Sequence, residues 1–236
     1  MNPKMELPAI ANSRPHAVAL LRAYFADADA SAVLKSPERF TGAHFERFAG
    51  GGDAVGVRNT YTAEDLVAVS MLGVDIDGHA ALRILDGLAP ALSAHLARIP
   101  HTLDLVHATP TDLGEGSGAY DLWSELKKVQ GLGPTKVGKL ISRKRPRLIP
   151  VYDSVVSRIL KAPNGRYWSS IQGLLQSPMG EMGPSINDYL AEVRTDAGIG
   201  DDISTVRVLD VIVWMSGGAG RRQRGLARAG LKELTN

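Results

Sequence analysis

The chain has 236 residues, of which 44% are hydrophobic, 22% charged and 6% aromatic. These proportions are typical of a globular protein, and they exclude disordered, collagen-like and low-complexity classes. The absence of cysteine excludes a disulfide framework, a thiolate zinc site, an iron–sulfur cluster and a cysteine nucleophile. A reducing compartment fits such a sequence, and the first residues contain no apolar run typical of a signal peptide. We therefore expect a cytoplasmic protein with no membrane-spanning segment.

Apolar residues recur at helical spacing almost throughout the chain, which predicts an all-α fold. Pro90 is expected to divide one long helix in two, and the acidic run after Thr62 is typical of a helix start. Glycine and proline clusters predict loops at residues 49–53, 109–118 and 162–166. Helices are expected at residues 16–29, 63–73, 78–98, 120–129, 134–144, 153–160, 169–176, 185–195 and 204–215.

The formal net charge of +2 conceals an uneven distribution of charge along the chain. Residues 126–152 include eight basic residues and no acidic one, and residues 217–236 include five basic residues against one acidic residue. The remainder of the chain is acidic. This asymmetry favours a polyanionic partner, and a solvated basic helix face is the alternative explanation.

The most informative segment is VQGLGPTK, residues 129–136. A helix is expected to end at Gly131, and Pro134 takes the first position of the next helix, where its missing N–H has no cost. Glycine N–H groups and a helix N-terminus can together face a phosphate oxygen. The segment thus predicts a helix-hairpin-helix motif at about residues 120–145, a motif that grips the DNA backbone without reading its sequence. A glycine-capped turn between packed helices is the alternative.

The region 120–160 resembles the helix-hairpin-helix (HhH-GPD) DNA glycosylase superfamily. Members of that superfamily carry a catalytic aspartate at the start of the helix that follows the hairpin, and Asp153 in VYDSVVSR, residues 151–158, matches this position. Bifunctional members also have a catalytic lysine two residues after the second hairpin glycine. That position is Thr135 here, and Asp153 follows it by the spacing found in the family. Residues 63–69 resemble the first helix of the family's helical domain.

The resemblance implies two helical lobes, one made of residues 1–59 with 153–236 and the other of residues 60–152. It implies an enzyme that hydrolyses the N-glycosidic bond of an extruded damaged or modified base in DNA, with Asp153 as the catalytic carboxylate. Because Thr135 replaces the lysine, we expect a monofunctional enzyme without Schiff-base chemistry. The glutamine that often fills the space left by the base is absent near Val74, and the lack of cysteine implies a divergent member without an iron–sulfur cluster.

No cofactor or metal site is expected, because no metal-binding motif is present and His95, His101 and His107 share no helix face. We expect a monomer whose partner is DNA. The residues expected to contact the DNA backbone are Gly131, Leu132, Gly133, Thr135, Lys136, Lys139 and Arg143.

Three aromatic residues, Tyr120, Trp123 and Tyr152, are candidates for a base pocket or a wedge in the duplex, with core packing as the alternative for each. Asp153 is equally suited to cap the helix that follows it, and this role is compatible with catalysis. Two other functions remain open: a non-catalytic DNA-binding protein that keeps the hairpin, and an all-α scaffold that binds an acidic protein.

Overall fold

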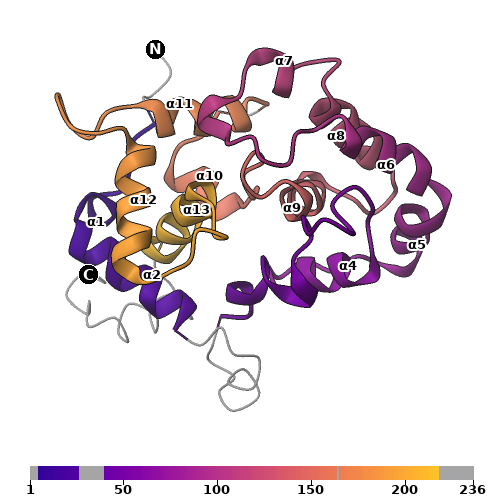
Figure 1. Ribbon diagram of the computed structural model, residues 1–236, viewed down its shortest axis with the longest axis horizontal. Helices are drawn as coiled ribbons and strands as arrows, with labels where there is room; N and C mark the ends of the chain where they lie inside the picture. The colour runs from indigo at the N-terminus through magenta and orange to yellow at the C-terminus, as the bar shows by residue number, and fades with distance from the viewer. Residues whose placement is uncertain (1–4, 27–39, 164, 218–236) are drawn as a thin grey trace. The chain divides into compact units, whose positions relative to one another are not determined.

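The computed structural model describes residues 5–26, 40–163 and 165–217. Within these ranges the regular elements are helices and there is no β-strand, which confirms the predicted all-α class. The chain forms two compact units (Figure 1): unit 1 comprises residues 1–43 and 153–236, and unit 2 comprises residues 44–152. Across the described ranges, no helix is long and apolar enough to cross a lipid bilayer.

Unit 2 is a set of short helices around α9, the helix at its centre. Short 3-10 turns lie at Phe48–Gly50 and Leu105–His107, and a third, at Thr41–His44, spans the point where the chain passes from unit 1 to unit 2. A π-helical turn lies at Arg83–Gly87. The α-helices are α4 (Ala63–Ser70), α5 (Gly78–Leu82), α6 (Ala89–Ala97), α7 (Pro110–Leu113), α8 (Gly118–Lys127) and α9 (Pro134–Lys144). Helix α9 packs against α4 and α8, and its residues 137–144 are all buried.

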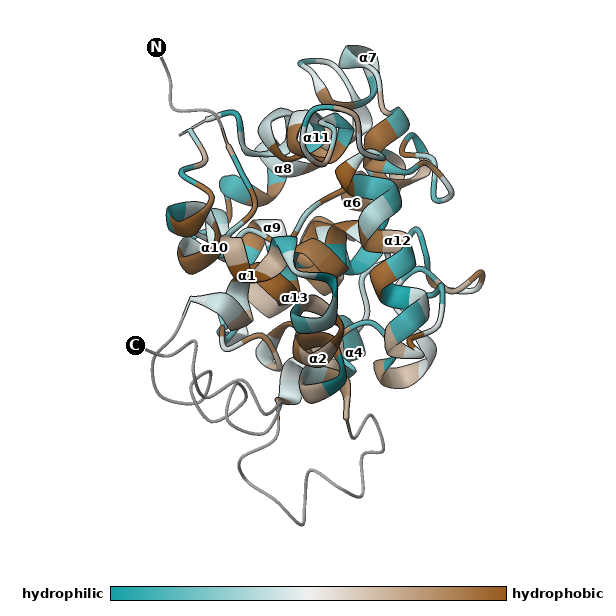
Figure 2. Cartoon of the chain, turned by 90° about the vertical axis from the view of Figure 1, so that its left-hand side faces the viewer, coloured by the Kyte–Doolittle hydropathy of each residue, from teal (hydrophilic) through white to brown (hydrophobic). Residues whose placement is uncertain are grey.

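Unit 1 is formed by helices from both ends of the chain. Helix α13 is its buried centre and packs against α2 and α12. Helix α12 carries both hydrophilic and hydrophobic residues (Figure 2). An aromatic cluster of Tyr24, Phe25, Phe40 and Trp214 forms one part of this core. The helices are α1 (Ala9–Asn12), α2 (Arg14–Phe25), α10 (Ser154–Ile159), α11 (Tyr167–Gln176), α12 (Ile186–Ala197) and α13 (Thr205–Ser216).

Most helices start where a polar side chain satisfies free backbone N–H groups. Ser117, Ser185 and Ser204 each accept a hydrogen bond from the N–H three residues later, at the starts of α8, α12 and α13. Thr62 and Thr109 start α4 and α7 with capping boxes. The capping box at Thr109 also explains why α7 forms inside residues 109–118, which the sequence predicted wrongly to be a loop throughout.

Pro90 divides the long helix predicted for residues 78–98, as expected. A proline ring clashes with the carbonyl four residues earlier in a regular helix. The chain avoids this clash with a wider turn at Arg83–Gly87, in which the Leu88 N–H donates to the Arg83 carbonyl at 2.8 Å. Helix α6 then starts at Ala89 with Pro90 in its first turn.

The predicted lobe boundary after residue 59 differs from the boundary between the units, which lies after residue 43. Residues 45–59 belong to unit 2 because their carbonyl groups bind cations of α9 and of the residue after it, as described below. Residues 27–29 of the first predicted helix and the basic segment at 218–236 lie outside the described residues.

Candidate nucleic-acid interface

Helices α8 and α9 lie side by side and are joined by residues 128–133, here called the α8–α9 turn (Figure 1). Gly131 has φ +85°, a left-handed conformation that favours glycine. Leu132 between the two glycines is buried and holds the turn on the core of unit 2. Pro134 is the first residue of α9, as predicted. The sequence Gly-Leu-Gly-Pro therefore fixes a tight turn whose two glycines are exposed.

The N-terminus of α9 presents backbone N–H groups that no described residue uses. Val137 donates to the Gly133 carbonyl at 3.1 Å, whereas no described group accepts from the N–H groups of Gly133, Thr135 or Lys136. Such N–H groups, together with the positive end of the helix dipole, can bind a phosphate oxygen. Thr135 and Lys136 are half-buried, so both lie near the surface at this point.

One carboxylate lies beside the turn. Asp77 caps α5 by accepting from the Ala80 N–H at 2.9 Å, and a Cβ on Gly131 would lie only 2.5 Å from its Oδ2 atom. The Ala80 N–H lowers the pKa of Asp77, and the charge of Lys136 lowers it further. A side chain larger than glycine at position 131 is therefore disfavoured by the backbone conformation and would displace the Asp77 carboxylate.

Half of the basic residues in the segment 126–152 are buried, which corrects two of the expected DNA contacts. Lys139 is buried and donates to the Leu72 carbonyl at 2.8 Å, and Arg143 is buried against residues 45–48. Neither cation is available to a phosphate group. Lys144 and Arg145 are buried too, and Arg147 forms an ion pair with Asp104 at 2.9 Å. Arg147 and the other three basic residues of the segment, Lys127, Lys128 and Lys136, are exposed or half-buried.

Arg143, Lys144 and Arg145 together with Asp65 form what we call the buried cation cluster. Asp65 accepts from the Arg143 Nε at 3.1 Å and forms an ion pair with the Lys144 ammonium, so a single carboxylate faces two cations directly. Burial lowers the pKa of Lys144, and Arg143 and Arg145 lower it further, whereas Asp65 raises it. The side chain of Asp65 is only 2% exposed. Without the charge of Asp65, Arg143 and Lys144 would be buried with no counter-ion in contact, which is strongly destabilising.

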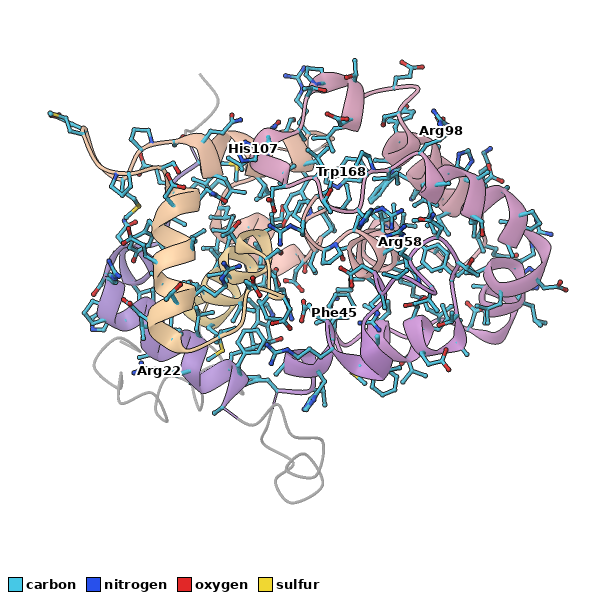
Figure 3. The ribbon with its side chains drawn as sticks, in the orientation of Figure 1. Arg22, Phe45, Arg58, Arg98, His107 and Trp168 are labelled. Carbon is cyan, nitrogen blue, oxygen red and sulfur yellow. The ribbon has the colours of Figure 1, made fainter. Side chains whose placement is uncertain are left out.

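Backbone carbonyl groups provide most of the remaining hydrogen bonds to the buried cation cluster. Arg143 donates to the carbonyls of Phe45, Glu46 and Phe48. Lys144 donates to those of Gly52 and Val57, at 3.0 and 3.1 Å. Arg145 donates to the carbonyls of Leu96, Ile99 and Arg58 and to the Asn59 side chain. The hydrogen bonds of the cluster thus connect residues 45–59 and the end of α6 to the end of α9. Phe45 and Arg58 in this region are labelled in Figure 3.

Replacing Tyr61 with phenylalanine is expected to leave stability at neutral pH unchanged or to raise it by up to about 1 kcal/mol. The Tyr61 hydroxyl is buried without a hydrogen-bond partner among the described residues, and the Lys144 ammonium lies 5.6 Å from the ring centroid. Burial, with a smaller effect of Asp65, raises the pKa of Tyr61 well above its ordinary value.

An unfolded tyrosine ionises at about pH 10, whereas the folded protein holds Tyr61 neutral, so this residue's contribution to stability is complete below that pH and is lost above it. Urea unfolding across alkaline pH should therefore show a smaller loss of stability in Tyr61→Phe than in the wild type. A clear loss of stability at neutral pH would contradict this account of the hydroxyl.

Asp153 is the N-cap of α10. Its Oδ1 atom accepts from the N–H groups of Val155 and Val156, at 2.8 and 3.4 Å, and no described residue donates to its Oδ2 atom. The preceding residue, Tyr152, is packed on α9, because a Cβ on Gly138 would lie 2.8 Å from the Tyr152 Cβ. The capping role expected for Asp153 is therefore present, and one carboxylate oxygen is left for another partner.

The three candidate aromatic residues differ in exposure. Tyr120, in the first turn of α8, is 41% exposed, while Trp123 and Tyr152 are half-buried. Tyr120 is thus the best placed of the three to contact a ligand from the surface of unit 2. In the described part of the chain, no group of three or more acidic, histidine or cysteine residues is arranged to hold a metal ion.

A family model described as "Family of unknown function (DUF6308)" matches residues 17–217. The chain belongs to this family. The region matched by the DUF6308 model includes the α8–α9 turn, the buried cation cluster and Asp153, so each of them lies within the family's own extent. No curated protein and no solved structure matches the chain.

Proposed function

We propose that this member of the DUF6308 family is a cytoplasmic, monofunctional DNA N-glycosylase, in which the α8–α9 turn acts as a helix-hairpin-helix. The observation that carries the proposal is the start of α9 at the α8–α9 turn, together with the sequence spacing from Thr135 to Asp153. In unit 2, α9 begins with N–H groups around Thr135 that no described residue uses. In unit 1, α10 begins at Asp153, whose Oδ2 atom has no donor among the described residues.

The proposed DNA contact is electrostatic and independent of sequence. A phosphate oxygen would accept hydrogen bonds from the N–H groups of Gly133, Thr135 and Lys136, and the Lys136 ammonium would add charge. Gly131 and Leu132 would contribute by shaping the turn rather than by donating from a side chain. Such a contact positions the DNA. The base would be selected by the free energy of unstacking and unpairing its nucleotide, which is lowest for a damaged or mispaired base.

The proposed chemistry is hydrolysis at the sugar carbon C1′ of an extruded nucleotide. The bond from C1′ to the base breaks, and the base leaves with the bonding electrons and takes up a proton. A water oxygen bonds to C1′, and its proton passes to the Asp153 carboxylate and then to solvent. The negative charge of Asp153 also stabilises the positive charge that develops on the sugar ring, as carboxylates do in glycoside hydrolysis. Thr135 cannot form a Schiff base, so the strand would stay intact.

The test is to incubate the protein with duplexes that carry a panel of altered bases and to analyse the products. The proposal predicts free base and an abasic site in equal amounts, with strand cleavage only after alkaline treatment. A second candidate function, a non-catalytic DNA-binding protein, is favoured by the capping role of Asp153 and by Thr135 at the lysine position. It predicts salt-dependent binding and no base release from any duplex.

Alanine at position 133 is expected to weaken DNA binding about tenfold without lowering stability. Gly133 has an ordinary φ of −79°, and a Cβ there would have no neighbour within 4 Å, but the added methyl group would obstruct the N–H groups of α9. Alanine at position 131 should instead destabilise the fold by about 1–2 kcal/mol, because φ is positive there.

Gly56→Ala is the matched control, since it also adds a methyl group into open space in unit 2 and should change neither property. Fluorescence anisotropy and urea unfolding measure the two effects. Equal DNA affinity for wild type and Gly133→Ala would remove the turn from the binding site.

A further inference from the structure

The exposed face of α8 carries a strip of residues that leads along the helix to the α8–α9 turn. Tyr120, Ser124 and Lys127 recur at helical spacing, so they lie on one face of α8. Tyr120 and Lys127 are exposed and Ser124 is half-buried, whereas Leu122 and Leu126 on the opposite face are buried. Lys128 is exposed beside Lys127, and the turn with Gly131 follows directly. We call Tyr120, Ser124, Lys127 and Lys128 the α8 strip.

Of the two acidic residues of α8, Asp121 pairs with a cation outside the strip, whereas Glu125 pairs with Lys128 of the strip, so the net positive charge of the strip comes from Lys127. Asp121 forms an ion pair with Arg98 at 2.7 Å, and Glu125 forms one with Lys128 at 2.8 Å. Arg98 lies at the end of α6, where Figure 3 labels it. Lys127 has no acidic partner among the described residues. Lys127, Lys128 and Lys136 are the surface cations of the segment 126–152 other than Arg147, and all three lie on or next to the turn.

The dimensions of the strip fit a nucleic-acid backbone. Tyr120 and Lys127 are seven residues apart, which in a helix is about 10 Å. One DNA strand advances about 3.4 Å per nucleotide, so the strip spans about three nucleotides. An exposed aromatic ring at the end of a cationic track is the combination that binds unpaired bases, since every base can stack on such a ring.

We propose that the α8 strip is a second DNA contact, in which Lys127 and Lys128 bind phosphates of the strand held by the α8–α9 turn and Tyr120 stacks on an unpaired base. This inference rests on the proposed function and deepens it, because it names DNA with an unpaired or mispaired base as the favoured ligand.

The experiment measures the affinity of the full chain for fluorescein-labelled DNA over a range of salt concentrations. The probes are a fully paired duplex and the same duplex with one unpaired base. Removing two phosphate contacts in Lys127→Ala/Lys128→Ala should reduce the slope of log affinity against log salt by about 1.8. The control Arg83→Ala removes an exposed cation of unit 2 from the π-helical turn, and it should leave the slope unchanged.

Tyr120→Ala should weaken binding of the probe with the unpaired base about 5- to 150-fold and leave binding of the paired duplex unchanged. Tyr120→Phe keeps the ring and should bind as the wild type does. An unchanged slope in the lysine variant, or an equal effect of Tyr120→Ala on both probes, overturns the inference. If Gly133→Ala still weakens binding in that case, the proposed function stands without the α8 strip. A wild-type protein that binds neither probe would overturn both.

Discussion

Asparagine in place of Asp65 is expected to lower the free energy of unfolding by about 3–5 kcal/mol. Asp65 is the carboxylate that contacts two members of the buried cation cluster, Arg143 and Lys144. Asparagine has nearly the same volume but no charge, so both cations would stay buried without a counter-ion. The carbonyl groups around them carry only partial charge. Urea unfolding followed by circular dichroism measures the loss.

Glu64→Gln is the matched control, because it neutralises an exposed carboxylate on the same turn of α4 and should change stability by no more than about 0.5 kcal/mol. A second variant identifies the cause. Lys144→Met removes one of the two cations, so Asp65→Asn/Lys144→Met should be more stable than Asp65→Asn alone. A double variant that is less stable than Asp65→Asn, or equal effects of the changes at positions 64 and 65, would contradict the account of the cluster.

Most of the longer helices could be predicted from the sequence because their ends carry local signals, whereas the one-turn helices α1 and α7 were missed. Helix α9 spans the predicted residues 134–144, since Gly133 and Pro134 start it and Pro146 follows closely after its end. The split at Pro90 followed from the same kind of reasoning. These signals act within a few residues of the chain and need no knowledge of tertiary contacts.

The buried cation cluster could not be predicted from local signals. A count of charges cannot separate a lysine that faces water from one whose ammonium is bound by carbonyl groups of a distant loop. One signal was available: Lys144 follows Val137, Leu140 and Ile141 at helical spacing, which places it on the apolar face of α9. Its partner Asp65 lies far away in the sequence, and only the fold brings them together. Four of the eight basic residues of the segment 126–152 are therefore part of the core, and the other four lie at the surface.

Asparagine in place of Asp153 is expected to reduce base excision at least about 100-fold while leaving stability unchanged. Asparagine caps a helix as well as aspartate does, so α10 keeps the hydrogen bonds that Val155 and Val156 now donate. The variant lacks the negative charge needed to stabilise the sugar and to accept a proton from water. Single-turnover kinetics on the best substrate of the panel measure the loss.

Asp112→Asn is the control for this change, because Asp112 is a capping carboxylate of α7 and lies outside α8, α9 and α10. It should excise at the wild-type rate. DNA affinity of Asp153→Asn should also match that of the wild type, since the residue is not among the proposed phosphate contacts. Full excision activity in Asp153→Asn would exclude this carboxylate from the reaction.

The most direct test of the proposed function is a crystal structure of Asp153→Asn bound to a duplex that carries the preferred base. The account predicts a phosphate oxygen about 3 Å from the N–H groups of Gly133 and Thr135, and an extruded nucleotide with its C1′ atom next to residue 153. DNA bound elsewhere on the protein, with the α8–α9 turn facing solvent, would contradict it.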